Sequence, residues 1–233
     1  RILAEKLSCD GLRTLWIDSR DLVRTKGGKV DTQLTYSNIK SVVEGHPEVD
    51  VFVAPGFIAR DETGHVCTLG RGGSDYSAAL YAAALGAQTL QIWTDVPGIM
   101  TTNPKDVASA RTIPTISYEA AFCLADHGAK VLYAPTVGPA MESNIAIAIL
   151  NTFQPKAAGT IIKALPKKGR GDWLGIASAK ADGDLAQLCL VADGRINQAR
   201  LDEVLARLAK SSIQVASSRL EGDDHALIYV PAK

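Results

Sequence analysis

Hydrophobic and polar positions in the first 162 residues alternate between the patterns of strands and of helices. Four runs read as strands: 12–18, which alternates apolar and polar residues, 89–95, and the largely apolar runs 50–58 and 145–150. Residues 36–43 show helical spacing, and residues 76–85 are almost all Ala, Leu and Tyr, which predicts a helix buried on more than one side. Buried strands between helices favour a mainly parallel sheet covered on both faces, so we expect an α/β fold with three α-β-α layers.

Shorter elements are predicted between these runs. The polar, glycine-bearing stretch 20–28 indicates a loop, and the turn signal inside 60–67 indicates a hairpin. Ser117 caps a predicted helix that continues to about residue 126, and a second short helix covers 137–142. Residues 159–162 are expected to pair near the run at 145–150.

The pattern changes at a basic stretch rich in Pro, Lys and Gly, which we interpret as a linker over 163–172. Beyond it the sequence predicts, in order, a strand, an amphipathic helix and two strands joined by a tight turn: 186–191, 198–210, 213–220 and 226–230. The helix should turn Leu201, Val204, Leu205 and Leu208 inward. This order is most of a ferredoxin-like α+β unit, so residues 1–162 and 173–233 are predicted to be separate domains.

Composition narrows the function classes. The 233 residues carry 25 basic and 25 acidic side chains, so no overall field attracts nucleic acid or an acidic membrane. No apolar run approaches the roughly 20 residues that span a bilayer. The charged start is not a secretory signal and reads as the middle of a helix, so we expect the protein to begin upstream of Arg1.

The cysteines and histidines give no sign of a metal site in the sequence. Cys9, Cys67, Cys123 and Cys189 lie far apart without a CxxC spacing, which favours reduced thiols and a cytoplasmic location. The four histidines are isolated and are interpreted as structural or surface residues: His46, His65, His127 and His225.

The glycine-rich stretch 68–77 holds the most suggestive chemistry. Its glycines allow backbone N–H groups to approach an anion at the start of a helix. Arg71 offers a planar fork for a carboxylate or phosphate, and Asp75 offers a charge for an ammonium group or a metal. A turn in which Ser74 or Asp75 merely caps the helix fits the residues equally well.

A second candidate lies where the strand at 89–95 ends. Ligands collect beyond the carboxyl ends of strands in open α/β sheets, which is where Thr94 and Asp95 stand. Lys130 ends a later element. The alternatives are a turn residue before Pro97 for Asp95 and a lysine that complements a helix dipole for Lys130.

Several separated segments resemble aspartate kinases of the amino-acid-kinase superfamily. The stretch 68–75 resembles the hallmark loop of that family, and Trp93 to Ile99 with Thr102 to Lys105 resembles its nucleotide segment. Ser117 to Ala120, Gly128 to Leu132 and 151–160 follow in the family's order. The resemblance covers residues 1–162, and 173–233 resembles the ACT regulatory domain by element order.

This resemblance implies a fold, a reaction and a set of site residues. The activity would be ATP- and Mg²⁺-dependent phosphorylation of the β-carboxylate of L-aspartate to β-aspartyl phosphate, the first step toward lysine, threonine and methionine. Substrate-binding residues would be Arg71, Gly72, Gly73, Ser74 and Asp75. Nucleotide-binding residues would be Thr94, Asp95, Met100, Lys105 and Lys130. No residue is predicted to bind a metal directly.

The chain also departs from the family pattern. Met100 replaces a tyrosine and Lys105 an arginine, which suggests a looser grip on the nucleotide. The family's catalytic lysine and a glutamate that helps to hold aspartate have no counterpart and are expected upstream of residue 1. We therefore expect the 233-residue chain alone to form no acyl phosphate.

The ACT-like part implies feedback by an amino acid such as lysine or threonine, and assembly of copies through these domains. Two other functions stay open from the sequence. One is a non-catalytic amino-acid-binding regulatory protein with a kinase-like fold, and the other is a different amino-acid kinase.

Overall fold

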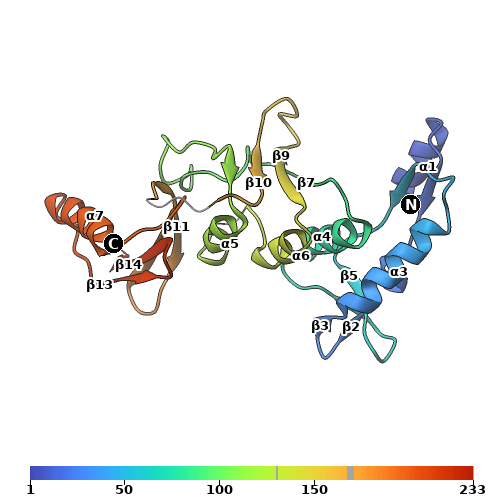
Figure 1. Ribbon diagram of the computed structural model, residues 1–233, viewed down its shortest axis with the longest axis horizontal. Helices are drawn as coiled ribbons and strands as arrows, with labels where there is room; N and C mark the ends of the chain where they lie inside the picture. The colour runs from blue at the N-terminus through green and yellow to red at the C-terminus, as the bar shows by residue number, and fades with distance from the viewer. Residues whose placement is uncertain (130, 167–170, 233) are drawn as a thin grey trace. The chain divides into compact units, whose positions relative to one another are not determined.

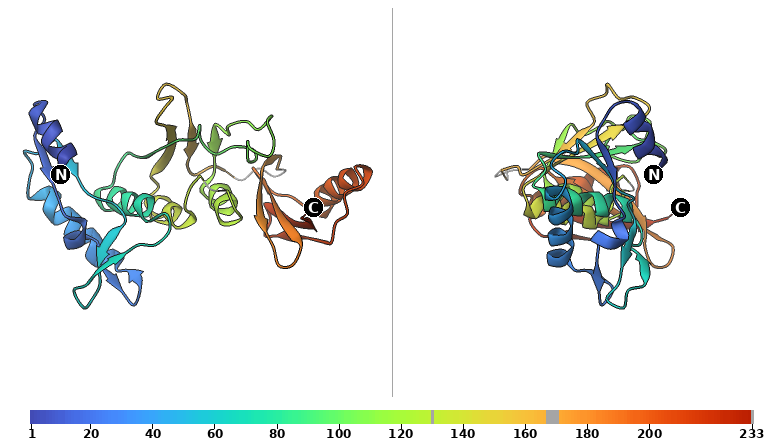
Figure 2. Two further views of the ribbon diagram at one scale, coloured as in Figure 1. Left: turned by 180° about the vertical axis from the view of Figure 1, so that it is seen from behind. Right: turned by 90° about the vertical axis from the view of Figure 1, so that its right-hand side faces the viewer.

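The computed structural model describes residues 1–129, 131–166 and 171–232, drawn in Figures 1 and 2. Contacts between Cα atoms divide the chain into two compact units. The first contains residues 1–90 and 138–145, and the second contains 91–137 and everything from 146 onward. The predicted linker over 163–172 falls inside the second unit, and its residues 167–170 lie outside the described part. The predicted domain boundary stays a prediction.

The first unit is built around helices α3 and α4, which pack against each other (Figure 1). Its helices are α1 (Ile2–Cys9), α2 (Ser19–Leu22), α3 (Thr32–Glu44) and α4 (Gly73–Leu85). Its strands are β1 (Thr14–Trp16), β2 (Thr25–Lys26), β3 (Lys29–Val30), β4 (Val51–Val53), β5 (Ile58–Arg60) and β6 (Val66–Thr68). Strands β1 and β4 pair in parallel, and their apolar side chains join the buried Ile39 and Ile17.

Two predictions for this unit need correction. The stretch 20–28 is not a simple loop, because Asp18 accepts a hydrogen bond from the Arg20 N–H and caps α2, and β2 pairs with β3 beyond it. A four-residue helix is too short to produce a hydrophobic period. The strand predicted over 50–58 ends at Val53, before the Pro55-Gly56 break, and Phe57 beyond it has a positive φ of 76°. The predicted hairpin at 60–67 is confirmed as β5 and β6.

The second unit begins with a four-stranded mixed sheet in the order β7-β9-β10-β8. Its elements are β7 (Thr89–Thr94), β8 (Thr115–Ile116), α5 (Tyr118–Asp126), the 3-10 turn η1 (Ala134–Thr136), β9 (Ala146–Asn151) and β10 (Thr160–Ile162). The first two residues of β7 belong to the first unit. Strand β10 pairs with β9 antiparallel, as expected for 159–162, and with β8 in parallel. Ser117 caps α5 through a hydrogen bond from the Ala120 N–H, as predicted. Helix α6 (Val137–Glu142), almost wholly in the first unit, has its predicted bounds.

The rest of this unit is an antiparallel sheet in the order β11-β12-β14-β13. Its elements are β11 (Trp173–Lys180), β12 (Leu185–Ala192), α7 (Gln198–Lys210), β13 (Ser217–Glu221) and β14 (His225–Pro231). Leu201 of α7 is fully buried, and the three other residues predicted to turn inward pack around the same cluster. Sequence reasoning missed β11, and it began β13 too early, since Ile213 is exposed.

The two faces of this sheet are covered by different helices. Leu190 of β12 packs in the cluster beneath α7. Its neighbour Cys189 points to the opposite face, because side chains alternate along a strand, and there it meets Cys123 of α5. Helix α5 thus lies beside β11 and β12 (Figure 1). None of the described helices combines the length and the apolar character that a membrane crossing requires.

Candidate functional site

The glycine loop ends in a helix start that no side chain caps. Gly72, in the left-handed conformation with φ of 67°, is the N-cap of α4, and helix α4 begins at Gly73. Ser74 and Asp75 therefore lie inside the first turn, and the interpretation of either as a cap is wrong. The first-turn amide groups of α4 are directed at whatever lies before the helix, as in anion sites at helix N-termini.

The segment after β4 holds this helix start in place. The Phe57 N–H donates to the Ser77 hydroxyl at 3.1 Å, and the Leu69 N–H donates to the Phe57 carbonyl oxygen at 2.9 Å. A Cβ at Gly73 would lie 2.9 Å from the Phe57 ring, so only glycine fits there. Sequence reasoning missed Phe57 and Ser77. The sequence offered only a serine in the Ala-, Leu- and Tyr-rich run 76–85, and its full burial is seen in the structure alone.

Asp75 is a half-buried carboxylate with no hydrogen-bond or ion-pair partner among the described residues. Burial raises the pKa of its carboxyl group above the ordinary value. Arg71, four residues earlier, is exposed. A half-buried carboxylate with no counter-charge among the residues that the structure describes is suited to receive a cationic group such as an ammonium.

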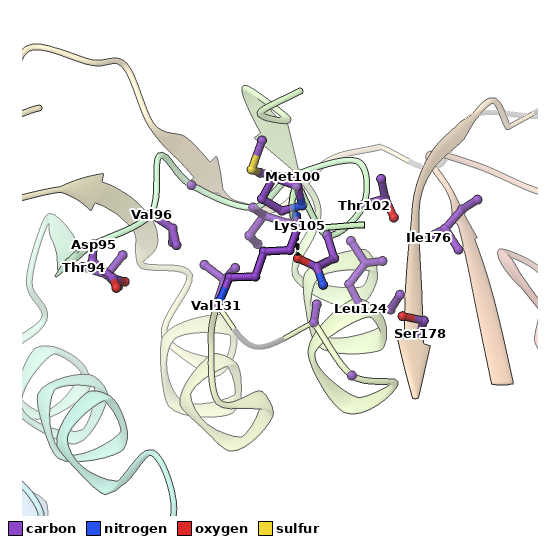
Figure 3. A pocket seen from close by; sticks show the side chains of 17 residues that line it. Thr94, Asp95, Val96, Met100, Thr102, Lys105, Leu124, Val131, Ile176 and Ser178 are labelled. Carbon is purple, nitrogen blue, oxygen red and sulfur yellow. Dashed lines mark hydrogen bonds between the residues drawn. The ribbon is translucent and has the colours of Figure 1, made fainter. Parts of the chain in front are cut away.

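The second unit contains a cavity of about 390 Å³ (Figure 3). Three segments form its wall: the loop after β7, the end of α5 with the residues that follow, and β11. The lining residues are Thr94, Asp95, Val96, Gly98, Ile99, Met100, Thr102, Asn103, Pro104, Lys105, Leu124, Gly128, Ala129, Val131, Ile176, Ala177 and Ser178.

Charged and polar groups occupy distinct parts of this wall. Thr94 and Asp95 lie together at the end of β7, and the Thr94 hydroxyl donates to the Asp95 carboxylate at 3.2 Å. Lys105 extends across the cavity toward Val131, while Ile176 and Ser178 stand on the side away from Asp95 (Figure 3). The Lys105 N–H donates to the Asn103 side-chain oxygen at 3.1 Å, which fixes the turn that carries the lysine.

A buried threonine fixes the loop after β7. Thr160 of β10 is fully buried; its hydroxyl accepts from the Ile99 N–H at 2.9 Å and donates to the Ile113 carbonyl oxygen at 2.7 Å. The neighbouring Gly98 has a φ of 124°, and a Cβ there would lie 2.5 Å from the Thr160 hydroxyl. The loop is thus joined to the sheet by contacts that require glycine at position 98 and the threonine hydroxyl at position 160.

The third part of the wall was not foreseen, because β11 was not predicted. The Ile176 N–H donates to the Thr101 carbonyl oxygen at 2.7 Å and ties β11 to the cavity loop. A Cβ at Gly128 would lie 2.4 Å from the Ser178 carbonyl oxygen, so the chain after α5 passes directly against β11.

The predicted site residues divide between the two units. Thr94, Asp95, Met100 and Lys105, which are predicted to bind nucleotide, line one cavity. Residues 71–75 belong to the first unit, at the start of α4. Lys130 lies outside the described residues. The role of each residue stays a prediction.

Residues 1–151 match the amino acid kinase family, and the chain therefore belongs to that family. Within it, the chain is similar to aspartokinases. It is 38% identical to lysine-sensitive aspartokinase 3 of Escherichia coli K12 over 151 residues, which are 63% of this chain and 34% of the relative. The resemblance inferred from the sequence motifs is confirmed.

Solved structures of E. coli aspartokinase III have the same fold. The R-state complex with aspartate and ADP matches with a TM-score of 0.72 at 30% identity, covering 100% of this chain and 52% of that one. The T-state complex with lysine and aspartate matches with a TM-score of 0.66 at 30% identity, covering 98% and 52%. The predicted α/β class followed by a smaller α+β part is confirmed, although the four-stranded sheet that was expected to be mainly parallel is mixed. The chain spans about a third or less of the length of the first curated relatives that it matches.

Proposed function

We propose that the chain is part of an aspartate kinase, in which the cavity of the second unit binds ATP and the start of α4 binds L-aspartate. The observation that carries this proposal is the cavity itself. It gathers Thr94, Asp95, Met100 and Lys105, which are spread over twelve positions of a loop, against an apolar wall from α5 and β11. E. coli aspartokinase III, whose structure is similar, has been solved with aspartate and ADP.

The chemistry of the cavity fits a nucleotide. Its volume lies in the range of roughly 300–1,000 Å³ that is usual for small-molecule sites. Ile99, Leu124 and Val131 offer apolar surface for a base, and Lys105 is the sole cationic side chain among the described lining residues. Phosphoryl transfer depends mainly on positioning and on neutralising phosphate charge, which a lysine and backbone amides provide.

The donor set also fits Mg²⁺ that arrives with the nucleotide. Asp95 is the sole carboxylate among the described lining residues. Mg²⁺ in kinases is commonly held by one or two carboxylates together with substrate phosphates. Asp95 would therefore hold the ion with the phosphates, and the ion would neutralise charge on the transferring group.

The start of α4 fits a small amino acid with two carboxylates. The half-buried Asp75 would pair with the substrate ammonium, and Arg71 with a carboxylate. The Gly73 N–H already donates to the Gly70 carbonyl oxygen at 3.0 Å, so the Ser74 amide of the first turn would face a second anionic group. Gly72 belongs to this site because its left-handed conformation leaves the helix start open.

The C-terminal sheet would have a regulatory role. We infer that 173–233 is an ACT-like domain that binds an amino acid effector, with lysine or threonine as candidates, and that pairs with a second copy. The support is the α/β arrangement with one helix on one face of an antiparallel sheet. The similar E. coli enzyme has also been solved with lysine. The pathway to lysine, threonine and methionine follows from the same proposal.

Nucleotide binding is tested by calorimetry with MgADP on Lys105→Ala and on the control Lys163→Ala, which changes an exposed lysine outside the cavity. Lys105→Ala is expected to weaken binding at least about tenfold, because a charge-assisted hydrogen bond contributes roughly 1.5–3 kcal/mol. Equal affinity in both variants, or no nucleotide binding by the unaltered chain, would overturn the assignment of the cavity.

Catalysis is tested in the full gene product by trapping the acyl phosphate with hydroxylamine. Aspartyl hydroxamate that depends on both ATP and L-aspartate supports the kinase. A product that binds lysine or threonine but forms no hydroxamate would instead be a non-catalytic regulatory protein.

A further inference from the structure

Three metal-binding side chains meet between α5 and the C-terminal sheet. Cys123 and His127 lie one helical turn apart on α5, a spacing that places both on one face. Cys189 comes from β12, and its sulfur lies 3.7 Å from the Cys123 sulfur. One ligand atom from each of the three residues lies within 4.8 Å of the other two. This group could not be predicted from residue spacing, because the two cysteines are separated by 66 positions.

The group sits in a fixed, buried setting. Cys189 is fully buried and Cys123 is 8% exposed, while His127 is half-buried at the end of α5. The close passage of Gly128 against the Ser178 carbonyl oxygen holds this end of α5 on the sheet. The three donors therefore come from two elements that already pack together.

A second group of donors shares the same histidine. His127, Glu221 and His225 also bring one ligand atom each within 4.8 Å, and the two imidazole centres lie 5.7 Å apart. The buried Oε2 atom of Glu221 accepts no hydrogen bond from a described residue, but it forms an ion pair with Arg219 at 3.6 Å. His127 thus belongs to two neighbouring groups of potential ligands.

Neighbouring oxygens orient both imidazoles. The Nδ1 atom of His127 lies 2.9 Å from the Cys123 carbonyl oxygen, and the Nδ1 atom of His225 lies 2.8 Å from the Asp224 carboxylate. The Nδ1 atom of His127 also lies 3.8 Å from the Cys123 sulfur, so this nitrogen faces the thiol pair.

We propose that Cys123, Cys189 and His127 form a binding site for a thiophilic divalent ion of the zinc type, with the fourth position open to solvent. Two thiolate sulfurs on a tetrahedral Zn²⁺ lie about 3.8 Å apart, since the Zn–S bond is about 2.3 Å, and the observed separation is 3.7 Å. Two sulfurs and one nitrogen, with a water molecule in the fourth position, are a ligand set that Zn²⁺ favours over harder ions. On binding, each thiol releases its proton to solvent.

The bound ion would join α5 to the C-terminal sheet. Leu124, next to Cys123, and Gly128, next to His127, both line the cavity described above. An ion at this point therefore stabilises one wall of that cavity, whatever the cavity binds. This site is independent of the proposed nucleotide and aspartate sites.

The test is metal titration of the purified, reduced chain with Zn²⁺ and with Co²⁺ as a spectroscopic probe. We expect one ion per chain, tetrahedral thiolate-ligated Co²⁺ absorption, and a rise in Tm on adding Zn²⁺. Cys189→Ala and His127→Gln should weaken binding at least about tenfold. Cys9→Ser, which removes an exposed cysteine, should leave binding unchanged.

His127→Gln separates loss of metal binding from loss of folding, because His127 is only half-buried and glutamine keeps a polar side chain at this position. Its Tm without metal should match that of the unaltered chain, while its response to Zn²⁺ is lost. Binding that persists in both site variants, or that disappears in Cys9→Ser, would overturn the proposal. A Cys123–Cys189 disulfide in the protein purified without reductant, with no metal uptake after reduction, would also overturn it.

Discussion

Single residues show most clearly what chemistry the sequence could and could not reveal. The residue types alone predicted that Arg71 and Asp75, placed beside glycines, could bind charged groups of a ligand. Two interpretations of Asp75 remained, a helix cap or a ligand-binding carboxylate, because both need the same residue near a helix start. The structure rejected the cap, since Gly72 occupies that position without a side-chain hydrogen bond.

Asp75→Asn is expected to raise Tm at neutral pH and to abolish binding of L-aspartate. Burial raises the pKa of Asp75 in the folded state, so its ionisation destabilises the fold as pH rises from the unfolded value of about 3.9 through the raised folded value. The gain in Tm should therefore disappear as the pH is lowered toward 4. Thermal unfolding as a function of pH and calorimetry with L-aspartate measure the two effects.

Asp61→Asn is the matched control, and we expect it to change Tm in the opposite direction. The Thr63 hydroxyl donates to Asp61 and lowers the pKa of this carboxyl group, so its ionised form stabilises the fold above the unfolded value and this stability is lost as pH falls. Asp61→Asn should lower Tm at neutral pH and leave aspartate binding intact. If both variants shift Tm in the same direction, the burial of Asp75 does not govern its effect.

At the scale of elements, long periodic segments were predictable and short ones were not. Helix α7 has its predicted bounds and its predicted inward face, because thirteen residues carry several turns of the hydrophobic period. Strand β11 was missed because Gly175 and small residues such as Ala177 and Ser178 give it no clear alternation. Its strand conformation depends on pairing with β12, which is a tertiary contact.

Leu201→Ala in α7 is expected to destabilise the C-terminal sheet by about 2–5 kcal/mol, because this side chain is fully buried in the cluster between helix and sheet. Urea unfolding followed by the fluorescence of Trp173, which packs against that cluster, reports the loss. Arg207→Ala on the exposed side of the same helix should change stability little. A similar loss in both variants would show that helix propensity, and not packing of Leu201, controls this element.

At the scale of the whole molecule, the sequence predicted a boundary at 163–172, where composition changes. The contacts divide the chain differently, with 138–145 returning to the first unit and the C-terminal sheet grouped with the cavity. Such a division cannot be read from composition, because the contacts that join β11 to the cavity loop are backbone hydrogen bonds with no sequence signature.

Hydrogen exchange should show that each ligand protects backbone amides in only one of the two units. MgADP is expected to slow exchange of backbone amides at 94–105, and L-aspartate at 70–77, because each ligand stabilises only the part that binds it. Mass spectrometry of peptides from these segments measures both effects. Protection of 70–77 by MgADP alone would contradict the assignment of these segments to different ligands.

The sequence by itself determined the α/β class, the family and the main helices, because these depend on local periodicity and on motifs whose residues are close together in the chain. Tertiary structure decided which residues share a site. It placed β11 in the wall of the cavity, left Asp75 without a partner among the described residues, and brought Cys123 to Cys189 across 66 positions. Distance along a chain says nothing about these contacts, because packing of α5 on the sheet, and not residue spacing, sets them.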